Sequence, residues 1–99
     1  MARPVALVVD DEPDIRELLA LTLERMDIEA STCGDVASAR DRLARREFQL
    51  CLTDMRLPDG DGIELIEWMQ GRGLKTPVAV ITAHGNVETA VRALKAGAF

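Results

Sequence analysis

The sequence predicts an α/β fold with a doubly wound parallel sheet. Short apolar runs alternate along the chain with longer amphipathic segments, which is the pattern of successive βαβ units. The first run, Val5 to Val9, is apolar throughout, as expected for a central strand that is buried on both faces. A chain of 99 residues is of the size that folds around one core, so we expect a single domain over 1–99.

Two strand–helix units are expected in the first half of the chain. After the strand at 5–9, Pro13 opens a helix, because its missing N–H costs nothing in the first helical turn. Residues 28–33 form a second, weaker strand, and Asp35 caps the helix that follows. Residues at helical spacing are expected to face the core along both helices. They are Ile15, Leu18, Leu19, Thr22, Leu23 and Met26 in the first helix, and Val36, Ala39 and Leu43 in the second.

The same alternation continues in the second half of the chain. Residues 48–53 form the third strand, and a loop rich in Pro and Gly follows at 57–62. The fourth strand is expected at 77–82. The helix between these strands has an inward face built on Ile63, Ile66 and Met69.

A last helix is predicted to start at Gly85 or Asn86 and to end at Gly97, a residue typical of helix C-termini. Its inward residues are Val87, Ala90, Val91 and Leu94. The alternation calls for another strand after Phe99. We therefore expect a C-terminally truncated fold, in which the fifth strand and the last helix are missing.

Composition excludes several classes of protein. The net charge of −5 argues against a nucleic-acid-binding surface, which needs a clustered basic excess. No apolar run approaches the roughly 20 residues that span a bilayer, and the N-terminus has no secretory apolar region, so we expect a cytoplasmic protein. Cys33 and Cys51 are interpreted as small buried residues with reduced thiols.

Three acidic residues follow predicted strands. Asp10 and Asp11 come after the first strand, and Asp54 comes after the third. In the flavodoxin-like strand order 2-1-3-4(-5), strands one and three are neighbours, so these carboxylates meet at one edge of the sheet. Close carboxylates repel, and a hard cation such as Mg²⁺ would relieve the repulsion. The alternative interpretation is that the acids are only capping and turn residues. Thr82 ends the fourth strand, where its hydroxyl can bind a phosphoryl oxygen.

Four stretches of the chain, in order and spacing, resemble the CheY-like response-regulator receiver family, and the resemblance covers the whole chain. They are Val8-Val9-Asp10-Asp11-Glu12, residues 52–62 (LTDMRLPDGDG), residues 80–85 (VITAHG) and residues 93–99 (ALKAGAF). The sequence is most similar to the NtrC-like group, and within it to the type IV pilus regulator branch.

The resemblance implies a role for each matching residue. Asp54 is the phosphoacceptor, and Thr82 contacts the acyl phosphate. Asp11 binds Mg²⁺ or Mn²⁺ directly and Asp10 assists through water. With Asp54, the backbone carbonyl of Arg56 completes the protein ligands. The side chain of Arg56, together with Ala83 and His84, tunes the lifetime of the phosphoryl group. The family's lysine on the fifth strand has no position in this chain.

The resemblance also implies partners. A sensor histidine kinase would supply the phosphoryl group, and the phosphorylated state would control an attached ATPase and DNA-binding module in σ54-dependent transcription. A homodimer is possible, whereas the chain itself would contact neither nucleic acid nor membrane. It would catalyse only its own phosphorylation and dephosphorylation, and so is not an enzyme in the usual sense.

Two other functions remain open. One is a receiver-like interaction module that binds partners without phosphorylation. The other is a Mg²⁺-dependent aspartyl phosphatase of the haloacid dehalogenase type, which also uses an Asp at the end of a strand. That family has Asp-x-Asp after its first strand, whereas here Asp10 is followed two residues later by Glu12.

Overall fold

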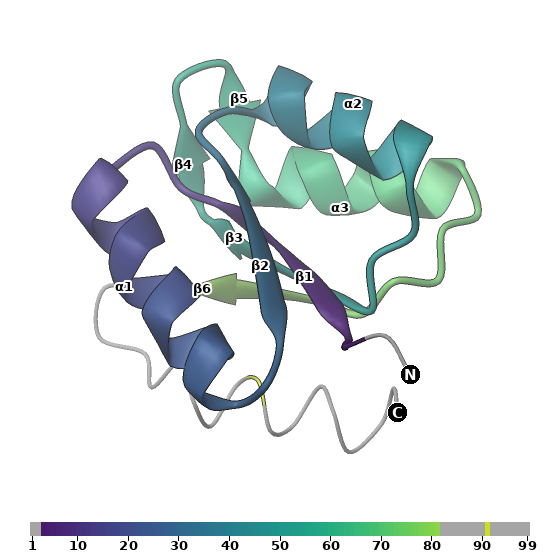
Figure 1. Cartoon of the computed structure of the whole chain (residues 1–99). Coiled ribbons are helices and arrows are strands. Elements are labelled where there is room, and N and C mark those ends of the chain that lie inside the picture. The colour runs from purple at the N-terminus through teal and green to yellow at the C-terminus, as the bar shows by residue number, and fades with distance from the viewer. Residues whose placement is uncertain (1–2, 82–90, 92–99) are drawn as a thin grey trace.

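The structure is a computed structural model that describes residues 3–81 and residue 91, and its centre is a four-stranded parallel sheet (Figure 1). The strands of this sheet are β1 (Val5–Val9), β2 (Glu29–Cys33), β3 (Leu50–Asp54) and β6 (Val78–Ile81). The helices are α1 (Pro13–Arg25), α2 (Val36–Arg45) and α3 (Gly62–Gly71). A small antiparallel pair, β4 (Arg56–Leu57) and β5 (Gly60–Asp61), lies between β3 and α3. The sheet order β2-β1-β3-β6 confirms the predicted strand order.

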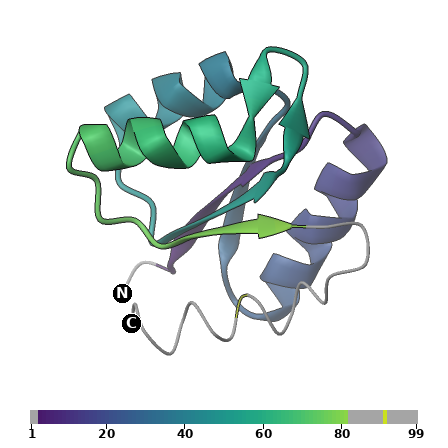
Figure 2. The same ribbon diagram turned by 180° about the vertical axis from the view of Figure 1, so that it is seen from behind.

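Alternate residues of the strands pack into two separate hydrophobic cores, one on each face of the sheet. Leu7 and Val9 of β1 pack with α2 and α3, whereas Ala6 and Val8 pack with α1. Side chains of a strand alternate between the two faces of a sheet, so a continuous apolar run is what a strand covered on both sides requires. Figure 2 shows the same layers from behind, with α2 and α3 together on one face of the sheet and α1 on the other.

The helix starts follow the predicted capping. Pro13 is the first residue of α1, and the side chain of Asp35 accepts a hydrogen bond from the Ser38 N–H at 2.7 Å. The cap of α3 was not predicted: the carboxylate of Asp61 accepts from the Glu64 N–H at 2.7 Å. Each of these two caps satisfies one of the amides that a helix leaves free in its first turn.

Two predicted helix faces were partly wrong. Leu18 of α1 is 59% exposed and Ile63 of α3 is 46% exposed, although both were expected to face the core. In α3 the buried residues are instead Gly62, Leu65 and Met69. Leu65 and Met69 are four residues apart and lie on the same face of the helix, toward the sheet. The predicted face advanced in steps of three residues from Ile63 and therefore missed Leu65.

The last predicted helix lies outside the described residues, except for one position. Val91 is helical and fully buried, and it packs in the core on the α1 side of the sheet. That burial confirms its predicted inward direction. In the described part of the chain, no helix has the length and apolar character needed to cross a membrane.

Both cysteines are free and buried, as predicted. Burial raises the pKa of the Cys33 thiol to about 11 and that of the Cys51 thiol to about 12. Thiols with such pKa values carry almost no thiolate at neutral pH and are inert toward oxidants and metals.

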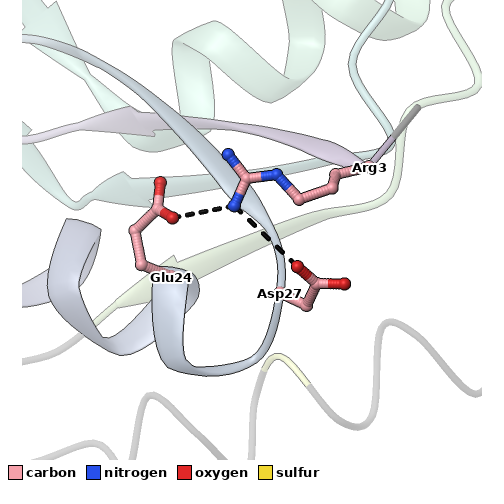
Figure 3. A network of polar contacts seen from close by, with 3 residues as sticks. All are labelled: Arg3, Glu24 and Asp27. Atoms are coloured by element: carbon pink, nitrogen blue, oxygen red, sulfur yellow. Dashed lines mark hydrogen bonds and ion pairs between the residues drawn. The ribbon is translucent and has the colours of Figure 1, made fainter.

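An exposed ion-pair network ties the beginning of the chain to the end of α1 (Figure 3). The Arg3 guanidinium lies 2.8 Å from a carboxylate oxygen of Glu24 and 3.9 Å from one of Asp27. Exposed pairs of this kind contribute little to stability, because solvent screens the charges and holding two long side chains in place costs entropy. The network therefore orients the entry into β1 more than it stabilises the fold.

Candidate functional site

Three carboxylates converge at the carboxyl edge of the sheet. Asp10 follows β1 and Asp54 ends β3, and these two strands are hydrogen-bonded neighbours. Each of Asp10, Asp11 and Asp54 offers an oxygen, and the three oxygens lie within 4.8 Å of one another. The predicted strand order thus brings together the three acids that the sequence singled out.

The three acids differ in burial and in hydrogen bonding. Asp10 is buried, with 6% of its surface exposed, and its Oδ1 accepts from the Glu12 N–H at 2.9 Å. Asp54 is half-buried, and its Oδ1 accepts from the Met55 N–H at 2.8 Å. Asp11 is exposed. Asp54 is therefore held by a backbone amide while part of its surface stays exposed.

The pKa of the buried member of the group, Asp10, is raised. Burial raises the pKa of Asp10 above its ordinary value, and the negative charges of Asp54 and Asp11 raise it further. The hydrogen bond from the Glu12 N–H acts in the opposite direction and lowers the pKa. A carboxylate that is held ionised beside two others is a group that a cation stabilises.

The oxygen donors fit Mg²⁺ or Mn²⁺. Mg²⁺ binds oxygen at 2.0–2.1 Å in an octahedron, so its adjacent ligand oxygens lie about 3 Å apart and opposite ones about 4 Å. The separations of up to 4.8 Å in the carboxylate group need only a small contraction to reach these values. Carboxylates are the ligands that hard divalent ions prefer. The chemistry of the donor set therefore matches the predicted metal.

Backbone contacts fix the turn that carries Asp10 and Asp11. The Asp10 N–H donates to the Cys33 carbonyl at 3.0 Å, which continues the β1–β2 pairing beyond the strand. The Asp10 carbonyl accepts from Nη1 of Arg16 at 2.7 Å. Arg16 was not predicted as a site residue, because one arginine in an amphipathic helix gives no distinguishing signal.

The segment after Asp54 folds back on itself as the β4–β5 hairpin, with Arg56 opposite Asp61. It is closed by a hydrogen bond of 2.8 Å from the Gly62 N–H to the Met55 carbonyl. A Cβ atom on Gly62 would lie 2.6 Å from the Asp54 carbonyl oxygen, so only glycine fits here.

Asp59 lies at the tip of this hairpin and contacts α2. Its carboxylate accepts from the N–H groups of Val36 and Ala37 at 2.8 and 3.0 Å. The hydrogen bonds from these two amides lower the pKa of Asp59. Sequence reasoning missed this contact, because an aspartate between proline and glycine is an ordinary turn residue.

The other predicted site residues are only partly described. Arg56 is exposed and lies two residues beyond Asp54, on β4. Thr82, Ala83 and His84 lie outside the described residues. Their predicted roles stay predictions, as do those of Arg56.

Comparison with known proteins gives consistent results. The family model described as the response regulator receiver domain matches residues 6–99. The response regulator protein PilR of Pseudomonas aeruginosa is 59% identical over 99 residues, which are 100% of this chain and 22% of that protein. The nitrogen assimilation regulatory protein NtrX of Azorhizobium caulinodans is 41% identical, over 94% of this chain and 21% of its own length. The DNA-binding transcriptional regulator NtrC of Escherichia coli K12 is 33% identical over 100% of this chain and 21% of its own length.

Solved structures agree with these relatives. The signal receiver domain of a LuxO repressor protein from Vibrio parahaemolyticus superposes with a TM-score of 0.78 at 28% identity, covering 98% of this chain and 75% of that one. The MaeR response regulator bound to beryllium trifluoride superposes with a TM-score of 0.75 at 31% identity, covering 92% and 76%. The chain thus spans most of these solved structures but only 21 to 22% of the three curated relatives.

Proposed function

The chain belongs to the response regulator receiver family, and from this premise we propose that it accepts a phosphoryl group on Asp54 in a Mg²⁺-dependent reaction. The observation that carries the proposal is the convergence of three carboxylate oxygens within 4.8 Å, with Asp54 accessible and Asp10 buried. The likeness to a response regulator bound to beryllium trifluoride adds support.

In the proposed reaction a carboxylate oxygen of Asp54 attacks the phosphorus of a phosphohistidine in a sensor kinase. An O–P bond forms on Asp54, the N–P bond of the donor breaks, and the histidine nitrogen leaves with the electron pair and takes a proton. The Met55 N–H holds the Oδ1 of Asp54, which orients the carboxylate for attack.

The metal site would be formed by residues on both strand ends. Asp11 and Asp54 would bind the ion directly, Asp10 would assist through water, and the Arg56 carbonyl would be a further ligand. The bound Mg²⁺ or Mn²⁺ supplies charge neutralisation among the phosphoryl and carboxylate oxygens. Thr82 would contact the new acyl phosphate, while the Arg56 side chain, Ala83 and His84 would set how readily water reaches it.

The process that this receiver would regulate is inferred from its relatives and not from the carboxylate site. PilR and NtrC are regulators, and NtrC is a DNA-binding one. We infer that this receiver controls an ATPase and DNA-binding module in σ54-dependent transcription in the cytoplasm, with a sensor histidine kinase as donor. The added charge on Asp54 would shift a two-state equilibrium of the domain and of a homodimer contact.

The test is phosphorylation by a small donor. The chain is incubated with acetyl phosphate and Mg²⁺, and intact mass is recorded beside an Asp54→Asn variant and a metal-free sample. We expect one phosphoryl adduct on the wild type and none in either control. An equal adduct on Asp54→Asn would refute the assignment of the nucleophile. No adduct on any sample would leave a receiver-like interaction module as the better account.

A further inference from the structure

The hairpin after Asp54 is anchored at a distance from the three carboxylates. The carboxylate of Asp59 at its tip accepts hydrogen bonds from the N–H groups of Val36 and Ala37, which lie 23 and 22 residues earlier in the chain. The α2 helix already has its own cap, since Asp35 accepts from Ser38 N–H at 2.7 Å. Its N-terminus therefore carries two carboxylates, one local and one brought by the hairpin. The helix dipole favours both negative charges.

Close packing also surrounds the two residues that flank this tip, Leu57 and Gly60. Leu57 is 9% exposed and belongs to the core that contains Val36 and Leu65. A Cβ atom on Gly60 would lie 3.2 Å from Cγ2 of Val36 and 2.9 Å from Oε2 of Glu64, so the hairpin fits closely between α2 and α3. The tip has little room to move while Asp59 holds the α2 amides.

The base of the hairpin carries the proposed ligands. Arg56 pairs with Asp61 across the two strands and follows Asp54 by two residues. Only the Leu57–Gly60 pair separates this base from the tip. A displacement of the tip must therefore pass into the backbone of Arg56.

We propose that Asp59 is a positioning residue for the metal site, which fixes the Arg56 backbone by holding the hairpin tip on the first amides of α2. The inference rests on the proposed function, which assigns the Arg56 carbonyl to the metal. Residues that orient metal ligands from the next layer typically change metal affinity about 10- to 100-fold when they are replaced. Coupling of two equilibria is reciprocal, so metal binding also strengthens the contact of Asp59 with α2.

The test compares two caps of one helix. Asp59→Ala and Asp35→Ala each remove one carboxylate that caps α2, so they are matched in charge and in the helix they weaken. Only Asp59→Ala releases the hairpin. The affinity for Mn²⁺ alone is measured from the loss of the electron paramagnetic resonance signal of the free ion, and thermal unfolding is recorded for each variant.

We expect both variants to melt at a lower temperature than the wild type, and only Asp59→Ala to bind Mn²⁺ about tenfold more weakly. Asp59→Asn keeps one acceptor oxygen and should recover part of the affinity. If Asp59→Ala binds like the wild type, or if Asp35→Ala weakens binding equally, the inference is wrong. Wild-type protein that binds no Mn²⁺ would overturn the metal assignment together with this inference.

A second measurement does not depend on the stability of any variant. Hydrogen exchange of the Val36 and Ala37 amides is followed in the wild type with and without Mg²⁺. We expect Mg²⁺ to slow the exchange of these two amides more than that of the Ser38 amide, whose partner is Asp35. Equal rates with and without Mg²⁺, in a protein that binds the ion, would overturn the inference alone.

Discussion

Asp10 illustrates how function at this site opposes stability. It is the most buried of the three carboxylates, and both burial and the charges of its neighbours raise its pKa. The folded protein therefore binds a proton at Asp10 more readily than the unfolded chain does. Its favourable contribution to stability is complete below the unfolded pKa, near 3.9, and is lost as the pH rises through the folded pKa.

We predict that Asp10→Asn raises the melting temperature of the metal-free protein at neutral pH. The asparagine carbonyl can still accept the Glu12 N–H, while the repulsion from Asp11 and Asp54 is gone. The advantage should shrink as the pH falls through the raised pKa of folded Asp10, and it should be gone below the unfolded pKa, near 3.9. Calorimetric melting of both proteins across this pH range measures the effect. A variant that is less stable than the wild type at neutral pH would contradict the repulsion argument.

The residues of the site were predictable to different degrees. Asp10, Asp11 and Asp54 were found because each follows an apolar run, and strand order decides which runs are neighbours. Asp59 and Arg16 were not found, since their roles depend on tertiary contacts with amides and a carbonyl that no local pattern encodes. A side chain that acts on distant backbone leaves no periodic signal.

Among the elements, the strands were predicted best. The strand expected at 5–9 has those bounds, and the one expected at 28–33 spans Glu29–Cys33. Val5–Val9 is a continuous apolar run, as expected of a central parallel strand, whereas Glu29–Cys33 is more polar and its first residue was predicted less closely. The β4–β5 hairpin was missed because strands of two residues have no period to detect. Leu18 and Ile63 were misplaced because periodicity does not decide which edge of a broad apolar face meets the sheet.

α1 and α3 end in the same C-terminal capping motif, but the position with positive φ is an aspartate after α1 and a glycine after α3. In α3 the Leu74 N–H donates to the Met69 carbonyl, and Gly73 has φ +71°. In α1 the Ile28 N–H donates to the Leu23 carbonyl, and Asp27 has φ +61°. This left-handed position after a helix favours glycine, because a Cβ atom is strained there.

Asp27→Gly should therefore stabilise the protein by about 1 kcal/mol, and Gly73→Ala should destabilise it by a similar amount. The lost contact with Arg3 is long, at 3.9 Å, and exposed, so its removal costs little (Figure 3). Urea unfolding of the two variants gives both values. The same sign for both substitutions would show that backbone strain is not what separates them.

At the scale of the whole molecule, the parallel sheet gathers charge at one edge. All four strands run in one direction, so the acids that follow β1 and end β3 share the carboxyl edge. The chain carries a net charge of −5. The packing of two apolar cores on opposite faces of the sheet must offset the repulsion among these acids. A cation that binds these carboxylates would reduce their repulsion and so increase the free energy of unfolding.

Mg²⁺ should consequently raise the melting temperature of the protein. A ligand that binds only the folded state stabilises it by about 1.4 kcal/mol at ten times its dissociation constant, or roughly 6 to 11 °C for a domain of this size. Asp11→Asn removes a proposed direct ligand and should abolish most of the rise. Asp14→Asn, an exposed acid in the first turn of α1, is the matched control and should keep it.

Melting is measured with Mg²⁺ and, separately, with Na⁺ at equal ionic strength, because general screening also weakens repulsion between exposed charges. A specific site requires that Mg²⁺ stabilise the wild type and Asp14→Asn well beyond Na⁺, while Asp11→Asn responds to the two salts alike. An equal response of all three proteins to both salts would mean that the carboxylates respond only to ionic strength. Their approach within 4.8 Å would then reflect strand order alone, without a bound ion to stabilise it.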